Sequence, residues 1–198
     1  MMHFFDFLRR MFPMAQPPAA PAPAKSKPAG TPSSPTATPP VRYYPQTNRK
    51  TPNVSAGRVI KPTHIVLHHS SGAYAGSVSW CIDPISKVSY HCIIARNGKR
   101  TVLATPSQRT WHAGVSSWQG RKDANSFSIG LAWEGDTYQV PLSDDAILSA
   151  VEYLLPIMDE YHIPLSNIIR HADVSPGRKD DCSPAAHAAL IAALNRAA

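Results

Sequence analysis

Three shortages narrow the class of protein to which this chain of 198 residues belongs. Long apolar runs are missing: no window reaches the ~18 consecutive apolar residues of a membrane-spanning helix, because proline or a charged residue interrupts each one. Cysteine is scarce, and three thiols are too few for a disulfide framework, although Cys81 and Cys92 could form one pair. Charged residues make up only 17% of the chain and hydrophobic ones 43%. We therefore expect a soluble globular protein, neither fibrous nor wholly disordered.

Clusters of lysine and arginine interleaved with aromatic residues are also absent. The 20 basic residues exceed the 13 acidic ones, which gives a net charge of +7. Part of this excess lies near the N-terminus, where Arg9, Arg10, Lys25 and Lys27 stand against Asp6. Such a mild, dispersed charge favours an anionic polymer or surface, such as a bacterial cell wall, as the partner. We expect no nucleic-acid binding.

Half of the 20 prolines lie within the first 40 residues, so the folding unit is shorter than the chain. Residues 1–12 predict a short amphipathic helix or a frayed terminus, and as a helix residues 1–14 could touch a membrane surface weakly. Their apolar patch precedes its arginines, which is the wrong order for a classical signal peptide. Residues 13–45, rich in Pro, Ala and Ser, predict a flexible linker. Residues 46–198 then form a single domain.

Hydrophobic patterns in the body predict buried strands. Residues 63–69 and 127–133 are short, continuous apolar runs, typical of strands that are covered on both faces. Residues 90–95 and 101–103 flank the dipeptide Asn97-Gly98, whose positive φ angles suit a hairpin turn. One antiparallel hairpin among otherwise interior strands predicts a sheet that is not purely parallel.

Two helices are predicted after these strands. Ser143 caps the first, whose apolar positions recur at helical spacing, and Pro156 should kink or shorten it. The second begins with Ser183 as its cap and Pro184 in its first turn, and it runs to Arg196. The expected fold is therefore α/β: a central mixed β-sheet flanked by helices, preceded by a disordered Pro/Ala-rich segment.

Polar residues with metal-binding side chains gather where the pattern places strand ends and loops. His68-His69 ends the first strand, Trp111-His-Ala-Gly114 lies in a loop, and residues 171–182 contain a histidine, three aspartates and a cysteine. Open sheets place their ligands at strand ends. A single histidine is more often structural than a metal ligand, but the constellation favours a site.

Five motifs in this order resemble those of the type-2 N-acetylmuramoyl-L-alanine amidases, a family that includes phage endolysins, wall-recycling amidases and peptidoglycan recognition proteins. The resemblance covers roughly residues 62–184. The motifs are Ile65-Val-Leu-His-His69, Ser89-Tyr-His-Cys-Ile-Ile94, Trp111-His-Ala-Gly-Val-Ser116, Asn125-Ser-Phe-Ser-Ile-Gly130 and His171 through Asp181.

The resemblance implies one catalytic Zn²⁺ ion and hydrolysis of the amide between N-acetylmuramic acid and L-alanine in peptidoglycan. A catalytic zinc ion needs three protein ligands and one open position. His68 and His171 match the two histidine ligands of the family. By its spacing Asp181 matches the third ligand of the recycling amidases, but other members use cysteine, and Cys182 is adjacent. The third ligand is therefore Asp181 or Cys182, with Asp181 preferred.

Three further residues receive catalytic roles from the resemblance. Lys179 matches the lysine that stabilises the developing oxyanion. The recycling amidases carry a glutamate where this chain has Ala132, and some phage amidases instead use the tyrosine that corresponds to Tyr90. We assign Tyr90 to proton handling, with Glu134, two residues beyond Ala132, as a substitute base if the strand stays regular.

The loop Trp111-His-Ala-Gly114 offers substrate contacts. Trp111 could give sugar or peptide an apolar platform, and His112 could donate a hydrogen bond to it. Asn125 is a weaker candidate for the same role. His69 alternates with His68 along the strand, so it should point to the opposite face and leave the metal alone.

The expected protein is a phage or prophage endolysin. It would be a monomer, made in the host cytoplasm and released to the periplasmic cell wall through a holin-type pore, and peptidoglycan or a muropeptide would be its substrate. Two alternatives stay open: a non-catalytic peptidoglycan-binding module and a bacterial muropeptide-recycling amidase. Ala132 argues against the recycling enzyme.

Overall fold

The computed structural model describes residues 43–197. The predictions for residues 1–12 and for the linker up to residue 42 lie outside the described residues. Packing begins slightly before the expected boundary at residue 46: Tyr44 is buried, its backbone N–H donates to Glu152 and its hydroxyl donates to Asp145. The last residues of the predicted linker thus belong to the folded domain.

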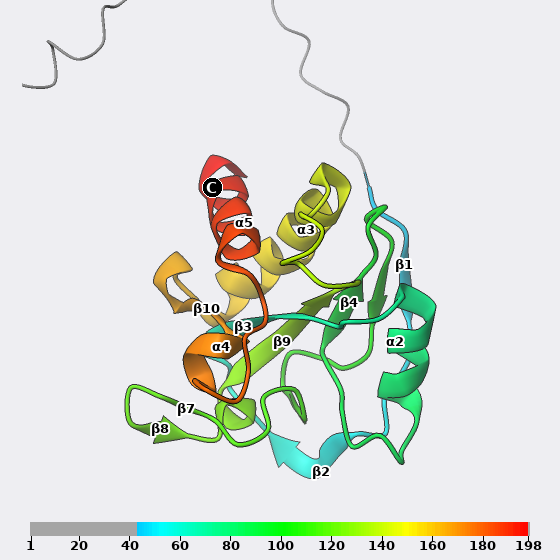
Figure 1. Ribbon diagram of the computed structural model, residues 1–198. Coiled ribbons are helices and arrows are strands. Elements are labelled where there is room, and N and C mark those ends of the chain that lie inside the picture. Colours follow the sequence, from blue (N-terminus) through cyan, green and yellow to red (C-terminus); the bar gives the residue numbers. More distant parts are fainter. Residues whose placement is uncertain (1–42, 198) are drawn as a thin grey trace, which may run out of the picture. The chain divides into compact units, whose positions relative to one another are not determined.

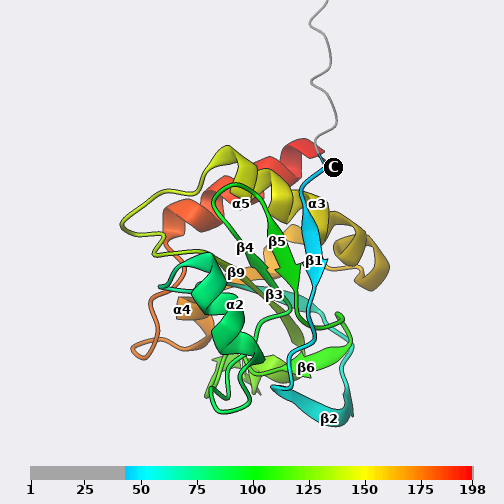
Figure 2. The same ribbon diagram turned by 90° about the vertical axis from the view of Figure 1, so that its right-hand side faces the viewer.

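A six-stranded sheet forms the centre of the domain, in the order β1-β5-β4-β9-β3-β10 (Figures 1 and 2). Only β4 and β5 pair antiparallel, and the other neighbours pair in parallel. The mixed sheet agrees with the expectation. Its strands are β1 (Gln46–Asn48), β3 (His64–His69), β4 (Cys92–Ile94), β5 (Arg100–Val102), β9 (Ser128–Trp133) and β10 (Ile168–Arg170).

Smaller elements complete the chain between these strands. Two strand pairs stand outside the sheet, β2 (Val54–Val59) with β6 (Gln108–Thr110) and β7 (Ser117–Trp118) with β8 (Arg121–Lys122). Two 3-10 turns, η1 (Ala124–Ser126) and η2 (Leu165–Asn167), lead into β9 and β10. None of them was expected from the sequence. All but β2 have two or three residues, too few for a readable period, and β2 contains Gly57 at a positive φ of 67°.

Helices cover both faces of the sheet. The long helices α3 (Asp144–Tyr161) and α5 (Pro184–Ala197) pack on one face, and α2 (Tyr74–Ile82) and α4 (His171–Val174) lie on the other (Figures 1 and 2). As predicted, Ser143 caps α3 by accepting the N–H of Ala146, and Ser183 accepts the N–H of Ala186 in α5. Pro156 does not shorten α3: it lies on the exposed side, and the helix continues to Tyr161.

Side-chain alternation gives the sheet two different faces. We call the side under α3 and α5 the core face, because large apolar side chains fill it. The opposite side, under α2 and α4, is the site face, and β9 presents only small residues there. The core face includes Ile65, Leu67, Ile129, Leu131 and Trp133, and the site face includes Val66, His68, Ser128, Gly130 and Ala132.

The two faces also separate the cysteines. Cys81 of α2 packs on the site face, whereas Cys92 points from β4 into the core face. All three cysteines of the chain are free and buried. The Cys81–Cys92 pair considered from the sequence is therefore not formed, because the sheet lies between the two side chains. Within residues 43–197, no helix combines the length and the apolar character that a bilayer crossing requires.

Candidate metal centre

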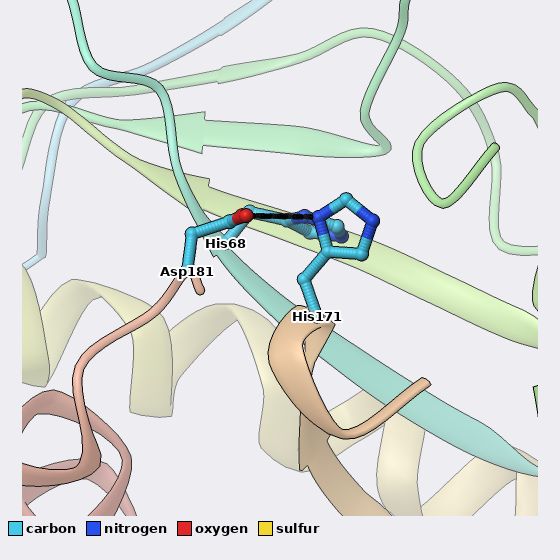
Figure 3. A group of neighbouring side chains, drawn as sticks. All are labelled: His68, His171 and Asp181. Carbon is cyan, nitrogen blue, oxygen red and sulfur yellow. Dashed lines mark hydrogen bonds and ion pairs between the residues drawn. The ribbon is translucent and has the colours of Figure 1, made fainter. Parts of the chain in front are cut away.

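Three side chains converge on the site face with their donor atoms toward one another (Figure 3). The Nδ1 atoms of His68 and His171 lie 3.0 Å apart, and Asp181 Oδ2 lies 3.1 Å from each of them. All three residues are buried. They form the group in residues 43–197 that can hold a metal ion.

The fold brings these residues together from distant parts of the chain. His68 is near the end of β3, and His171 follows directly after β10, the parallel neighbour of β3. Asp181 comes from the segment that leads into α5, and the side chain of Cys182 turns away into the apolar core beneath the helices. Of the two candidates for the third ligand, only Asp181 reaches the histidines.

The donor set fits a tetrahedral zinc ion. Zinc bonds to nitrogen and oxygen are about 2.0–2.2 Å long, so the ligand atoms of a tetrahedral ion lie roughly 3.3 Å apart. The observed separations of 3.0–3.1 Å are close to this value. A metal-ligating imidazole also needs a partner for its other ring nitrogen. His171 Nε2 lies 3.2 Å from the Ala113 carbonyl oxygen, and His68 Nε2 lies 3.1 Å from His112 Nδ1.

Electrostatics keep His68 and Asp181 in the protonation states that a metal ion requires. Burial, and to a smaller extent the neighbouring His171, lower the pKa of His68 to about 4, so the His68 ring is neutral at pH 7. Burial alone would raise the pKa of Asp181, but its contacts with His171 and His68 outweigh burial and hold that pKa far below its usual range. The centre thus combines a neutral imidazole with a carboxylate, as metal binding demands.

A cavity of about 320 Å³ opens over the centre. Tyr90, Trp111 and Lys179 line it together with His171 and Asp181. A larger hollow of about 950 Å³ shares Trp111 and Gly114 with it. The centre is therefore open to a ligand on one side, and its three protein donors are buried on the other.

Tyr90 and Lys179 both line the cavity over the centre. The rings of Tyr90 and His68 have centroids 5.0 Å apart. Burial raises the pKa of the Tyr90 hydroxyl, so this group keeps its proton and can donate a hydrogen bond. Lys179 is exposed at the rim of the cavity. Their roles in the reaction stay predictions.

Glu134 does not have the geometry of a base. Its two carboxylate oxygens accept the backbone N–H groups of Tyr74, the first residue of α2, and of Arg96. Strand β9 ends at Trp133, so the alternation that would have aimed Glu134 at the metal centre stops one residue too early. The residue ties two loops together, and the substitute-base interpretation was wrong. Ala132 packs in the apolar cluster beneath α2.

The three predicted substrate residues have different surroundings in the structure. Trp111 lines both cavities, and its ring N–H donates to Ser55, so an apolar platform there stays a prediction. His112 is buried with its ring nitrogens directed at His68 and Ser128, which leaves none for substrate. The amide oxygen of Asn125 accepts two backbone N–H groups of the 111–114 loop. The expected hydrogen bond from His112 to substrate was therefore wrong, whereas Asn125 also lines the larger hollow and its role toward substrate stays a prediction.

Comparison with known proteins adds an independent observation. The family model described as N-acetylmuramoyl-L-alanine amidase, Amidase_2, matches residues 58–184. The chain belongs to this family. The match contains every residue of the metal centre and nearly all of the six-stranded sheet, so the resemblance read from the five motifs is confirmed.

Individual relatives of the family have related names. The 1,6-anhydro-N-acetylmuramyl-L-alanine amidase AmpD of Haemophilus influenzae is 44% identical over 96 residues, which is 48% of this chain and 52% of that protein. The AmpD of Escherichia coli is 36% identical over 143 residues, 63% of this chain and 77% of that protein. The chain thus spans about half of the first relative and three quarters of the second.

A solved structure shows the same fold. It is that of the amidase AmiD from E. coli in complex with the substrate anhydro-N-acetylmuramic acid-L-Ala-D-gamma-Glu-L-Lys. The two chains are 26% identical, with a TM-score of 0.60 over 71% of this chain and 60% of AmiD. The expected α/β architecture with a central mixed sheet is confirmed.

Proposed function

We propose that this protein is a zinc-dependent amidase that cleaves the bond between N-acetylmuramic acid and L-alanine in a muropeptide. The observation that carries the proposal is the triangle of His68, His171 and Asp181, whose spacing fits a zinc ion and whose open side faces a cavity. Membership of the amidase family supports the same reaction. A protein that only bound peptidoglycan would not need three intact metal donors.

The comparisons favour a muropeptide-recycling amidase over the endolysin expected from the sequence. The AmpD relatives are named for the 1,6-anhydro form of the sugar, and the AmiD structure holds an anhydro-muropeptide. Nothing in these names supports an endolysin or release through a holin. The expectation of an endolysin was an analogy, and Ala132 only argued against the recycling enzyme; both carry less weight than relatives that match across the domain. We therefore propose a soluble anhydro-muropeptide as the preferred substrate.

The residues around the cavity can each contribute to such a hydrolysis. A bound zinc ion would polarise the scissile carbonyl and activate water. The Lys179 ammonium group would donate to the carbonyl oxygen as negative charge develops on it, an effect typically worth ~10²–10³ in rate. Tyr90 keeps its proton and would donate a hydrogen bond at the reacting amide. Trp111 would pack against the sugar or the peptide.

A direct assay tests the proposal. The purified full chain, loaded with zinc, is incubated with an anhydro-muropeptide or with intact peptidoglycan, and newly freed L-alanine amino termini are measured. We expect release from the anhydro-muropeptide, a slower release from intact peptidoglycan, loss of both after chelation, and recovery when zinc is restored. No new amino termini from either substrate with zinc bound would overturn the amidase, and faster lysis of intact peptidoglycan would restore the endolysin.

A further inference from the structure

Two adjacent residues of one loop contact both histidines of the metal centre from outside. His112 Nδ1 lies 3.1 Å from His68 Nε2, and the carbonyl oxygen of Ala113 lies 3.2 Å from His171 Nε2. Both contacts are on the ring nitrogens that point away from the centre. His112 and Ala113 are buried, with 5% and 0% of their surface exposed, so water does not compete for these contacts.

The hydrogen bonds of His112 fix which group donates and which accepts in the series that joins Ser128, His112 and His68. The Ser128 hydroxyl donates to the Ala124 carbonyl oxygen at 2.6 Å, so the Ser128 oxygen is free to accept from His112 Nε2–H at 3.4 Å. With its proton on Nε2, His112 offers the lone pair of Nδ1 and accepts from His68 Nε2–H. The Nδ1 atom of His68 then carries a lone pair that faces the centre.

His171 reaches the same state by a shorter route. A carbonyl oxygen can only accept, so the contact with Ala113 requires the proton of His171 to be on Nε2. The Nδ1 atom of His171 therefore also presents a lone pair to the centre. Both rings thus carry their protons on Nε2, the nitrogen that points away from the centre. The acceptor is a side-chain nitrogen for His68 and a backbone carbonyl oxygen for His171.

The loop itself is held in a fixed position. The Asn125 side-chain oxygen accepts the backbone N–H groups of His112 and Ala113 at 3.0 and 2.8 Å. Beneath the ring of His112, Gly130 of β9 leaves the necessary space, because a Cβ atom there would lie 2.5 Å from His112 Cγ. Gly130 below the loop and Asn125 beside it thus set the distance of the loop from the sheet.

We propose that His112 and Ala113, held by Asn125, are positioning residues that set the tautomer and the ring orientation of both histidine ligands. The proposal rests on the proposed function, because it needs a metal ion at the centre. Outer hydrogen bonds of this kind hold ligand rings in place and increase their basicity, and their loss typically weakens metal binding ~10–100-fold.

The test compares zinc affinities, measured by competition with a chromophoric chelator. His112→Leu removes the acceptor for His68, and we expect zinc binding to weaken by ~10–100-fold. His112→Asn places an oxygen near the position of Nδ1 and should restore most of the affinity. His91→Leu is the matched control: His91 is equally buried on the site face, and its ring hydrogen-bonds to Gln108, Thr110 and Gly130 but not to a ligand. Its zinc affinity should equal that of the unmodified chain.

A spectroscopic readout separates positioning from general loosening of the fold. In the unmodified, zinc-loaded protein, ¹H–¹⁵N correlation spectra should show the protons of His68 and His171 on Nε2. The absorption spectrum of the cobalt-substituted His112→Leu protein should change, and that of His91→Leu should not. Protons on Nδ1 in the unmodified protein would overturn the proposal, as would equal zinc affinities for His112→Leu and the unmodified chain or equal losses for His112→Leu and His91→Leu.

A second pair of variants decides the matter if His112→Leu does not fold. Asn125→Ala removes the acceptor that holds the loop and should weaken zinc binding, whereas Asn125→Asp keeps an oxygen there and should recover it. Unchanged affinity in Asn125→Ala would overturn the proposal. If the unmodified chain bound no zinc and released no L-alanine termini, the proposed function itself would fail, which is a different result from zinc binding that is insensitive to the loop.

Discussion

The two faces of the central sheet are equally buried but differ in what they bury. Strand β9 shows the contrast within six residues, since Ile129, Leu131 and Trp133 point into the core face and Ser128, Gly130 and Ala132 form the floor of the site face. On the core face two long helices cover hydrocarbon. On the site face, histidines occupy the space that the small residues leave free.

The difference teaches that stability and function depend on different kinds of contact here. Apolar side chains stabilise the fold through the area they remove from water, and this effect needs no particular direction. A buried imidazole stabilises nothing unless both ring nitrogens have partners, because an unsatisfied buried polar group costs about 1–3 kcal/mol. The core face should therefore respond to changes in volume, and the site face to changes in single hydrogen bonds.

Truncation on the core face should have the largest effect on stability. Leu154 of α3 is fully buried in the apolar cluster. We expect Leu154→Ala to lower the free energy of unfolding by about 3 kcal/mol, as buried leucine truncations do, and to lower Tm by roughly 6–12 °C. Zinc affinity should stay unchanged. Urea unfolding and chelator competition measure the two quantities.

Leu148 of the same helix provides the matched control. Its side chain is 48% exposed, so Leu148→Ala should change the free energy of unfolding by less than about 0.5 kcal/mol. If Leu154→Ala weakened zinc binding as strongly as it weakened the fold, the two faces would not be independent and the comparison would break.

Removal of the negative charge at the metal centre should instead have its main effect on zinc affinity. The apparent binding free energy of a four-ligand zinc site is about 10–16 kcal/mol, so the loss of one ligand should cost about 3 kcal/mol, or roughly 100-fold in affinity. We expect this loss of affinity, and a parallel loss of amide hydrolysis, from Asp181→Asn. Chelator competition gives the affinity, and freed L-alanine termini give the activity.

The neighbouring Asp180 is the control for that change. It is exposed and also lines the cavity, but it does not belong to the group of converging donors. Asp180→Asn removes the same charge from almost the same place and should keep zinc affinity near that of the unmodified chain. Equal losses in the two variants would indicate a general electrostatic effect in place of ligation.

Acid should destabilise the metal-free protein through the site face. Burial lowers the pKa of His91 to about 4, whereas an unfolded histidine has a pKa near 6.5. Below pH 6.5 the unfolded chain takes up a proton that the folded chain refuses, so stability falls as the pH falls. Between pH 6.5 and 5 the contribution of His91 should be a loss of about 2 kcal/mol.

The slope of stability against pH measures this effect. Urea unfolding of the metal-free protein at several pH values should give a shallower slope for His91→Leu than for the unmodified chain. Leu154→Ala should shift the whole curve down without changing its slope, because the apolar cluster around it contains no histidine. An unchanged slope in His91→Leu would show that this ring does not resist protonation in the folded state.

Much of the fold could be predicted because its main elements carry strong local signals. The apolar runs of β3 and β9, the Asn97-Gly98 turn and the capped helix α3 are all visible as short-range patterns. Helix α2 was missed because no side chain caps it and because its first turn contains Gly76, a poor helix former. Strands β1 and β10 have three residues each and depend on the sheet for their conformation.

The site also contains residues that could be predicted from the sequence and residues that could not. The predicted ligands stand at positions that a family motif marks, so a sequence can point to them. The role of Ala113 could not be predicted, because a backbone carbonyl oxygen has no residue signature and acts only through the fold that brings it to His171. Glu134 misled the prediction because alternation assumes a regular strand, and β9 ends one residue before it.

The smallest expected effect comes from the residue next to Asp181. Cys182 is fully buried in the core face, and burial raises the pKa of its thiol to about 12, so it stays protonated and makes a poor ligand. Cys182→Ala should cost about 1 kcal/mol of stability for the lost packing and leave zinc affinity and activity unchanged. Cys92→Ala, with its thiol buried in the same cluster but remote from the centre, should behave alike. If Cys182→Ala lost zinc while Asp181→Asn kept it, the thiol would be the third ligand, and the boundary between the two faces would have to be drawn one residue later.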